Sequence, residues 1–210
     1  MKIKGILFDM DGTLINTYEN QNYTKFFSDL NTTQKNLVKQ ILKENVHSFA
    51  VMENIIQKEL SKPEANDLIA KIHDFLIQHY KKSDLKKDAI RFLSYVKEKG
   101  YTLCLCTNNA TDIVHQILEE KQITSFFDFI VTSQQVKKSK PDPQMYQVAM
   151  HSTGLKPKEC IIFEDSESGI LAAEHADVPV VLVSENKALI KESVNMMIKD
   201  YADERLYEEF

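Results

Sequence analysis

Several residue types are scarce in this chain of 210 residues. It has no tryptophan, only 5 glycines and 5 prolines, and two arginines, Arg91 and Arg205. With 43% hydrophobic and 27% charged residues, this composition excludes a collagen-like or disordered chain and is typical of a globular protein. Two arginines and a net charge of -5 provide no basic stripe for a phosphate backbone, so we expect no nucleic-acid partner.

Long apolar runs are also missing. No stretch of about 18 uncharged apolar residues is present that could span a bilayer. The short apolar segment near the N-terminus is broken by Asp9, unlike the apolar region of a signal peptide. We therefore expect no membrane association and a cytoplasmic location.

Cysteine is rare and odd in number. Cys104, Cys106 and Cys160 lie in apolar, strand-like runs. In a chain without export signals this pattern favours reduced, buried thiols. Metal ligation is the alternative, but no second cysteine pair follows the one at 104 and 106.

Apolar runs alternate with amphipathic stretches over most of the chain. Glycine or polar residues separate them, as expected where strands alternate with helices. Strands are predicted at 3–8, 102–106, 129–131, 160–163, 180–183 and 196–198, and helices at 89–99, 110–120, 143–152 and 166–176, followed by a polar C-terminal helix. Such alternation predicts an α/β fold with a doubly wound, mostly parallel, Rossmann-like sheet covered by helices on both faces.

Residues 16–82 show a helical pattern alone. Apolar residues recur there every 3 to 4 positions, in stretches near 18–30, 34–45, 49–60 and 64–80. We therefore predict an α/β core formed by residues 1–15 and 83–210, with residues 16–82 inserted as an α-helical cap domain.

Polar side chains follow several of the predicted strands. Ligands of parallel sheets bind at the carboxyl ends of the strands. The side chains found there are Asp9, Asp11, Thr107, Asn108, Lys140, Glu164 and Asp165. Carboxylates crowded at one edge repel one another unless a divalent cation lies among them, and an all-oxygen site suits Mg²⁺. Together they offer the nucleophile, charge neutralisation and proton donor that phosphoryl transfer requires.

Four segments resemble the motifs of the haloacid dehalogenase superfamily, in the same order. They are Phe8-Asp9-Met10-Asp11-Gly12-Thr13-Leu14, Thr107-Asn108, Lys140-Pro141-Asp142-Pro143 and Phe163-Glu164-Asp165-Ser166-Glu167-Ser168-Gly169. The helical insertion after the first motif is similar to the subclass I cap of β-phosphoglucomutase-like and phosphoglycolate phosphatase-like members. The resemblance spans about 165 residues and all four motifs, which makes coincidence improbable.

The resemblance implies a role for each motif residue. Asp9 is the expected nucleophile and Asp11 the general acid/base, while Thr107 and Asn108 hold phosphoryl oxygens and Lys140 steadies nucleophile and phosphate. Mg²⁺ is expected on the Asp9 side chain, the Asp11 carbonyl, Glu164 and Asp165. Lys43 and His47 lie in the turn between two cap helices, where relatives place substrate-selecting groups.

Simpler interpretations exist for single motifs. Asp-Gly is a common turn dipeptide, Lys140 lies in a charged run, and Glu164-Asp165-Ser166 could serve only to cap a helix. The chain also departs from the family pattern: Asn16 stands where Asp is frequent, Asp177 where Gly is usual, and Lys87-Asp88 replaces a Pro-Gly. We expect Asp177 to adopt the left-handed backbone of the glycine it replaces.

The resemblance predicts a phosphatase that hydrolyses a small phosphomonoester metabolite, such as a sugar phosphate, through an aspartyl-phosphate. A β-phosphoglucomutase-type mutase is the alternative, although the cap lacks the arginine and glycine-rich turn that grip a second phosphate there. Lys43 and His47 could substitute. A regulatory module that binds phosphate without turnover is a further alternative. We expect a monomer.

Overall fold

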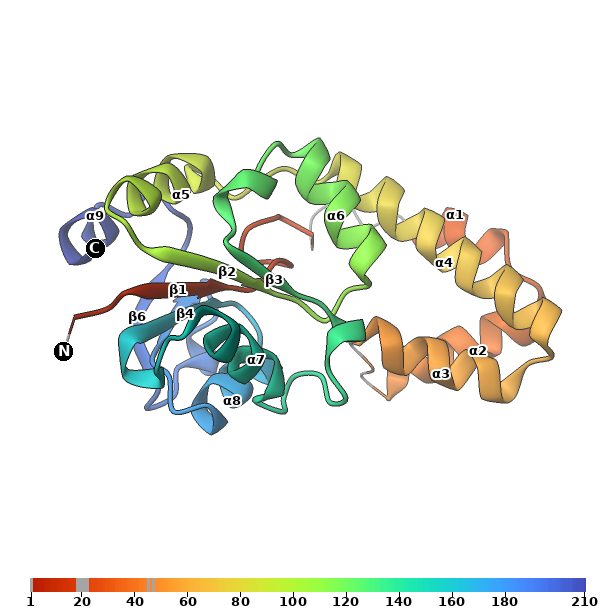
Figure 1. The fold of residues 1–210 in the computed structure, drawn as a ribbon. Coiled ribbons are helices and arrows are strands. Elements are labelled where there is room, and N and C mark those ends of the chain that lie inside the picture. Colours follow the sequence, from red (N-terminus) through yellow and green to blue (C-terminus); the bar gives the residue numbers. More distant parts are fainter. Residues whose placement is uncertain (1, 18–22, 45, 47) are drawn as a thin grey trace.

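The core of the protein is a six-stranded parallel sheet with the strand order β3-β2-β1-β4-β5-β6 (Figure 1). The computed structural model describes residues 2–17, 23–44, 46 and 48–210. The strands are β1 (Gly5–Phe8), β2 (Thr102–Cys106), β3 (Phe129–Val131), β4 (Cys160–Glu164), β5 (Val180–Val183) and β6 (Val194–Ile198). The predicted doubly wound parallel sheet is confirmed.

Helices cover both faces of this sheet. They are α5 (Ala89–Glu98), α6 (Thr111–Glu120), α7 (Gln144–Thr153) and α8 (Glu167–His175), with α9 (Arg205–Glu209) near the C-terminus. Figure 1 draws α5 and α6 above the sheet and α7 and α8 below it. Ile6 and Phe8 pack into the apolar cluster of one face and Leu7 into that of the other. Burial on both faces explains why the inner strands are continuous apolar runs.

The three cysteines belong to this buried core. Cys104, Cys106 and Cys160 are free thiols with no exposed surface. All three pack into the cluster that α7 and α8 cover. The prediction of reduced, buried cysteines is therefore confirmed.

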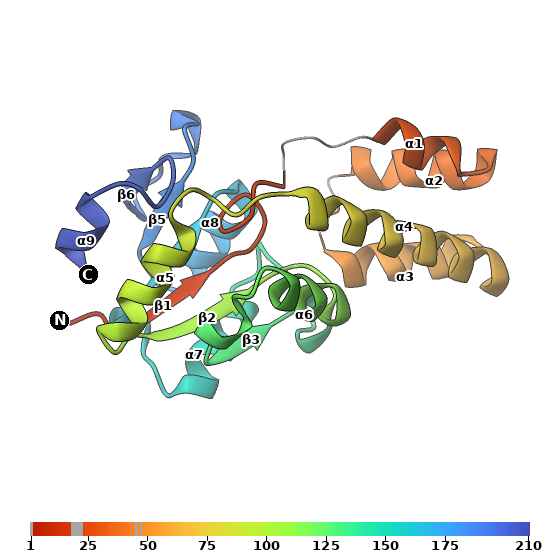
Figure 2. The ribbon, with the colours of Figure 1, turned by 90° about the horizontal axis from the view of Figure 1, so that it is seen from above.

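Four helices lie beyond the carboxyl edge of the sheet, within the range predicted for the cap (Figure 2). They are α1 (Tyr23–Ser28), α2 (Thr32–Lys43), α3 (Phe49–Glu59) and α4 (Lys62–Lys82). Helix α2 starts two residues before the predicted position because Asn31 caps it, accepting a hydrogen bond from the Gln34 amide at 2.9 Å. Pro63 lies in the first turn of α4, where its missing N–H costs no helical hydrogen bond.

The two connections between core and helices pair with each other. Ile15 and Leu85 form an antiparallel bridge, and the Lys86 amide donates to the Leu14 carbonyl at 2.8 Å. Asp88 and Asp177 both adopt the left-handed region, each with φ 58°. For Asp177 this confirms the expectation that it takes the backbone conformation of a glycine.

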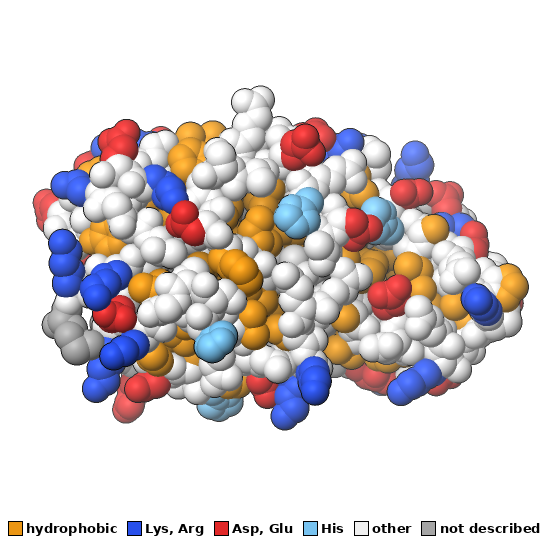
Figure 3. Space-filling view, in the orientation of Figure 1, with side chains coloured by type: hydrophobic (Ala, Val, Ile, Leu, Met, Phe, Trp, Pro, Cys, Tyr) orange, Lys and Arg blue, Asp and Glu red, His pale blue; other side chains and the backbone are white. Residues whose placement is uncertain are grey.

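The surface carries charges of both signs. On the face shown in Figure 3, acidic and basic side chains are interspersed with apolar ones. Within the described part of the chain, no helix combines the length and the apolar character needed to cross a membrane.

Candidate active site

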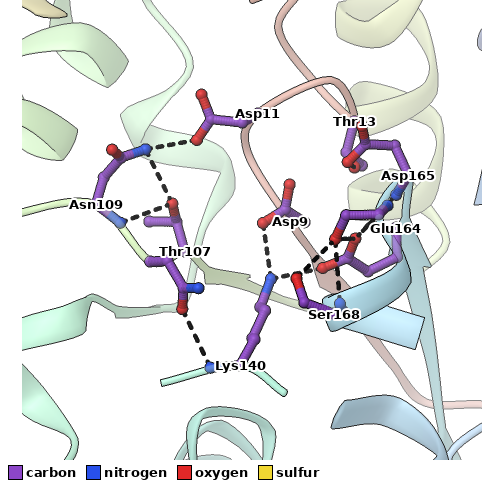
Figure 4. Close-up of polar contacts among 12 residues, drawn as sticks. Asp9, Asp11, Thr13, Thr107, Asn109, Lys140, Glu164, Asp165 and Ser168 are labelled. Carbon is purple, nitrogen blue, oxygen red and sulfur yellow. Dashed lines mark hydrogen bonds and ion pairs between the residues drawn. The ribbon is translucent and has the colours of Figure 1, made fainter. Parts of the chain in front are cut away.

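A buried lysine joins two acids at the carboxyl edge of the sheet. Lys140 Nζ lies 2.7 Å from Asp9 Oδ1 and 2.7 Å from Glu164 Oε1 (Figure 4). Asp9 follows β1, Glu164 ends β4, and these two strands are neighbours in the sheet. The side chain of Lys140 is only 2% exposed. Strand pairing thus brings Asp9 and Glu164 together, and the loop before α7 adds Lys140, so that three of the predicted site residues meet.

Glu164 is held from several sides. Its Oε1 also accepts from Tyr146 Oη at 3.1 Å, and its Oε2 accepts from the amides of Asp165 and Ser166 at 2.9 and 3.0 Å. Gly169 lies directly behind it, where any Cβ would collide with the carboxylate. The motif glycine is therefore required by a close approach rather than by a positive φ.

Asp11 is held by groups from the core and from a cap helix. Tyr80 Oη of α4 donates to Asp11 Oδ1 at 2.5 Å, and Asn109 Nδ2 donates to Asp11 Oδ2 at 2.5 Å. Asn109 Nδ2 also lies 2.7 Å from Tyr80 Oη. Neither Tyr80 nor Asn109 is among the residues that the sequence predicts for the site. Tyr80 fits the apolar spacing of a helix and is therefore expected in the core. Asn109 follows the Thr107-Asn108 motif by one position.

Thr107 and Asn108 take the places that the sequence predicts, at the end of β2. Thr107 is fully buried, and its Oγ1 accepts from the Asn109 amide at 3.3 Å. Asn108 Oδ1 accepts from the Lys140 amide at 3.3 Å, which braces the loop that carries the lysine.

Burial and charge set the ionisation of the site. Burial raises the pKa of Asp9 well above its usual range, and Lys140 opposes this rise. Burial also raises the pKa of Asp11, against the hydrogen bonds from Tyr80 and Asn109. For Glu164 burial acts in the same direction, but Lys140 and Ser166 outweigh it, so that the pKa of this carboxyl is lowered. Lys140 thus lies between one carboxyl whose pKa is raised, Asp9, and one whose pKa is lowered, Glu164, and both carboxylates raise the pKa of the lysine against burial.

The donor set fits a divalent cation. Asp9, Glu164 and Asp165 each offer a carboxylate oxygen within 4.8 Å of the others. The ion pair with Lys140 uses Oδ1 of Asp9, and a cation at the other oxygen would favour the ionised form of this acid. An all-oxygen set of this kind matches Mg²⁺. Because both oxygens of Glu164 already accept hydrogen bonds, its direct ligation of the cation stays a prediction.

A cavity of about 850 Å³ opens above these residues, between the core and the cap helices. Asp9, Asp11, Asn108, Lys140 and Asp165 line its floor. Its size is within the range of small-molecule sites.

The two cap residues predicted to select substrate are not shown at this cavity. Lys43 is exposed in the last turn of α2 and is not among the residues that line the cavity. His47 lies outside the described residues. Their roles stay predictions. The described cap side chains that do line the cavity are mostly apolar, together with His79 and Tyr80.

A family model for haloacid dehalogenase-like hydrolases matches residues 6–183. The chain belongs to this family. Membership confirms the resemblance that the four motifs carry, and with it an enzyme of hydrolase type.

Relatives and solved structures agree with this membership. A protein named pyrophosphatase PpaX from Bacillus cereus strain AH820 is 30% identical over 188 residues, covering 88% of this chain and 84% of the relative. The fold is similar to a predicted phosphoglycolate phosphatase from Haemophilus somnus 129PT, with TM-score 0.76, 23% identity and 99% of each chain covered. It is also similar to β-phosphoglucomutase from Clostridium difficile, with TM-score 0.72, 20% identity, and coverage of 99% and 96%. The two solved structures show a shared fold, and phosphatase chemistry is supported by the family and by the curated relative.

Proposed function

We propose that this chain is a magnesium-dependent phosphatase that hydrolyses a small phosphomonoester metabolite through an aspartyl-phosphate on Asp9. The observation that carries the proposal is the pairing of Asp9 with Lys140, 2.7 Å apart, at the floor of a cavity lined by further acids. Lys140 favours the ionised, nucleophilic form of this acid against the effect of burial, and Asp9 faces the cavity from which a substrate would approach.

The residues divide the reaction into two steps. Asp9 attacks phosphorus and the bond from phosphorus to the ester oxygen breaks, while Asp11 gives its proton to the departing oxygen. Asp11, now ionised, takes a proton from water, which attacks the phosphorus of the aspartyl-phosphate and releases Asp9. Lys140 and the donors around Thr107 and Asn108 stabilise the charge on the phosphoryl oxygens. Bound Mg²⁺ would supply further neutralisation of that charge from Asp9 and Asp165.

A phosphomutase is the second candidate function, and the described cavity favours it less. Such an enzyme must hold two phosphates. Of the described residues that line the cavity, Lys140 is the only lysine or arginine. It is already committed to Asp9 and Glu164. All proposed catalytic groups come from one chain, so the proposal includes a monomer. It also includes a cytoplasmic location and a free metabolite as substrate, without nucleic acid or membrane as a partner.

The test is phosphate release from p-nitrophenyl phosphate with Mg²⁺, by the parent and by Asp9→Asn. The amide is a poor nucleophile, so the variant should lose activity, and chelation should abolish parent activity until Mg²⁺ is restored. An Asp9→Asn variant as fast as the parent, or full activity in chelator, contradicts the proposal.

A further inference from the structure

The cavity above the site has a polar floor and an apolar roof. The floor comes from the core and contains the phosphoryl-transfer residues described above. The roof comes from the cap helices, and its side chains include Phe26, Ile41, Leu42, Phe49, Met52 and Phe75. These residues lie on all four cap helices, so each described helix of the cap contributes apolar side chains to the roof.

The polar side chains of the described part of the roof already have partners. Ser48 Oγ lies 2.7 Å from Ser139 Oγ, and His79 Nε2 lies 2.6 Å from the Thr17 carbonyl. The hydroxyl of Tyr80 donates to the carboxylate of the proposed acid. A polyol placed under this roof would bury several hydroxyls against apolar side chains, and these three polar groups could serve only some of them. Burying hydroxyls without partners is unfavourable, whereas burying apolar surface is favourable.

The charges that line the cavity also disfavour a substrate with a second anionic group. Lys140 is the one lysine or arginine on the described wall, and two carboxylates hold it at the floor. Glu167, also on the wall, is acidic. Among the described lining residues, a second phosphate or a carboxylate would meet no unpaired lysine or arginine.

We infer that the ester group of the substrate is uncharged, with a branched aliphatic or aromatic body that packs against the cap. The inference rests on the proposed function and narrows it from small phosphomonoesters in general to apolar ones. The inference predicts that sugar phosphates, phosphoglycolate and pyrophosphate are poor substrates of this chain.

The inference is tested with two primary alkyl phosphates of similar shape, cyclohexylmethyl phosphate and glucose 6-phosphate. Both carry a six-membered ring on a phosphorylated CH₂, so the difference between them is chiefly one of ring hydroxyls. We expect kcat/KM with Mg²⁺ to be at least about tenfold higher for the cyclohexyl ester, the scale of apolar discrimination in such pockets. Equal or faster turnover of glucose 6-phosphate, phosphoglycolate or pyrophosphate overturns the inference.

Variants of roof residues test whether the cap side chains cause the preference for the apolar ester. Met52→Gln and Leu42→Gln introduce amides into the roof and should lower the ratio of the two kcat/KM values several-fold. Leu42 is 53% exposed, so its variant should fold even if Met52→Gln does not. Ile90→Gln is the control, because Ile90 is 48% exposed on α5 and does not line the cavity. A ratio that stays at the parent value in Leu42→Gln, or falls equally in Ile90→Gln, contradicts the inference.

The outcomes of these experiments distinguish failure of the proposed function from failure of the inference about the substrate. If glucose 6-phosphate is preferred and Asp9→Asn is inactive, the inference is wrong and the proposed function stands. If neither alkyl ester nor p-nitrophenyl phosphate is hydrolysed, both are wrong.

Discussion

Tyr80 and Asp11 connect the cap to the core, with Tyr80 Oη 2.5 Å from Asp11 Oδ1. Tyr80 lies near the end of α4, the last cap helix, and is almost fully buried. Burial and the charge of Asp11 raise the pKa of Tyr80 well above its usual range, so its hydroxyl remains a hydrogen-bond donor. The position of α4 and the orientation of the proposed general acid are therefore linked through this hydrogen bond.

Tyr80→Phe should lower kcat for an alkyl phosphate up to about tenfold, since a hydrogen bond contributes roughly 0.5–1.5 kcal/mol and about 1.4 kcal/mol is a factor of ten. The loss should be smaller for p-nitrophenyl phosphate, whose leaving group needs little protonation. Tyr95→Phe is the matched control, because it removes a hydroxyl bonded to the Tyr207 carbonyl, far from the site. Equal losses with both substrates would assign Tyr80 a merely structural role.

Lys140 should contribute to stability as well as being required for activity. Lys140→Met leaves Asp9 and Glu164 buried without a cation, and breaking a buried pair costs about 3–5 kcal/mol of unfolding free energy. Urea denaturation measures this change. Adding Glu164→Gln to Lys140→Met should recover part of the stability but none of the activity. A single variant as stable as the parent would show that the ion pair does not hold this edge together.

Gly169→Ala should disturb the site without touching substrate. The added methyl group collides with the Glu164 carboxylate, which must move away from Lys140 and Ser166. We expect a loss of stability of about 1–3 kcal/mol, typical of overpacking, together with a fall in kcat. Ser168→Ala is the neighbouring control. Parent-like kinetics of Gly169→Ala would mean that Glu164 can shift without consequence.

Asp177→Gly should stabilise the protein. Asp177 has φ 58°, a conformation that costs a residue with a Cβ up to about 1–2 kcal/mol and glycine little. Asp74→Gly is the control of opposite sign, because Asp74 is exposed inside α4 and glycine there destabilises a helix by roughly 0.5–1 kcal/mol. Thermal unfolding of the two variants should shift in opposite directions. A lower melting temperature for Asp177→Gly would be inconsistent with strain at this position.

The sequence predicted the core well because its signals are local and strong. Apolar runs such as that ending at Phe8 mark strands buried on both faces, and polar residues directly after them mark strand ends. Since parallel strands end at one edge, Asp9, Lys140 and Glu164 could be expected to meet before any coordinates were known.

The remaining site residues depend on contacts that no local pattern shows. Tyr80 and Tyr146 lie on the buried faces of helices, where an aromatic residue reads as core, and only the tertiary packing places their hydroxyls against Asp11 and Glu164. The apolar roof was equally hidden, because the same 3 to 4 residue spacing serves the interior of a helical bundle and the wall of a cavity. Lys43 is exposed and is not among the residues that line the cavity, so its part in substrate selection stays a prediction.

The most direct test of the central claim is the mass of the enzyme quenched in acid during turnover. Asp11→Asn should slow the release of phosphate from the intermediate, so this variant is mixed with p-nitrophenyl phosphate and Mg²⁺, quenched and digested. The account predicts one added phosphoryl group on the peptide that contains Asp9, and none when Asp9→Asn is added. A phosphoryl group on another residue, or nitrophenol release by the variant with no phosphorylated peptide at any time, would contradict it.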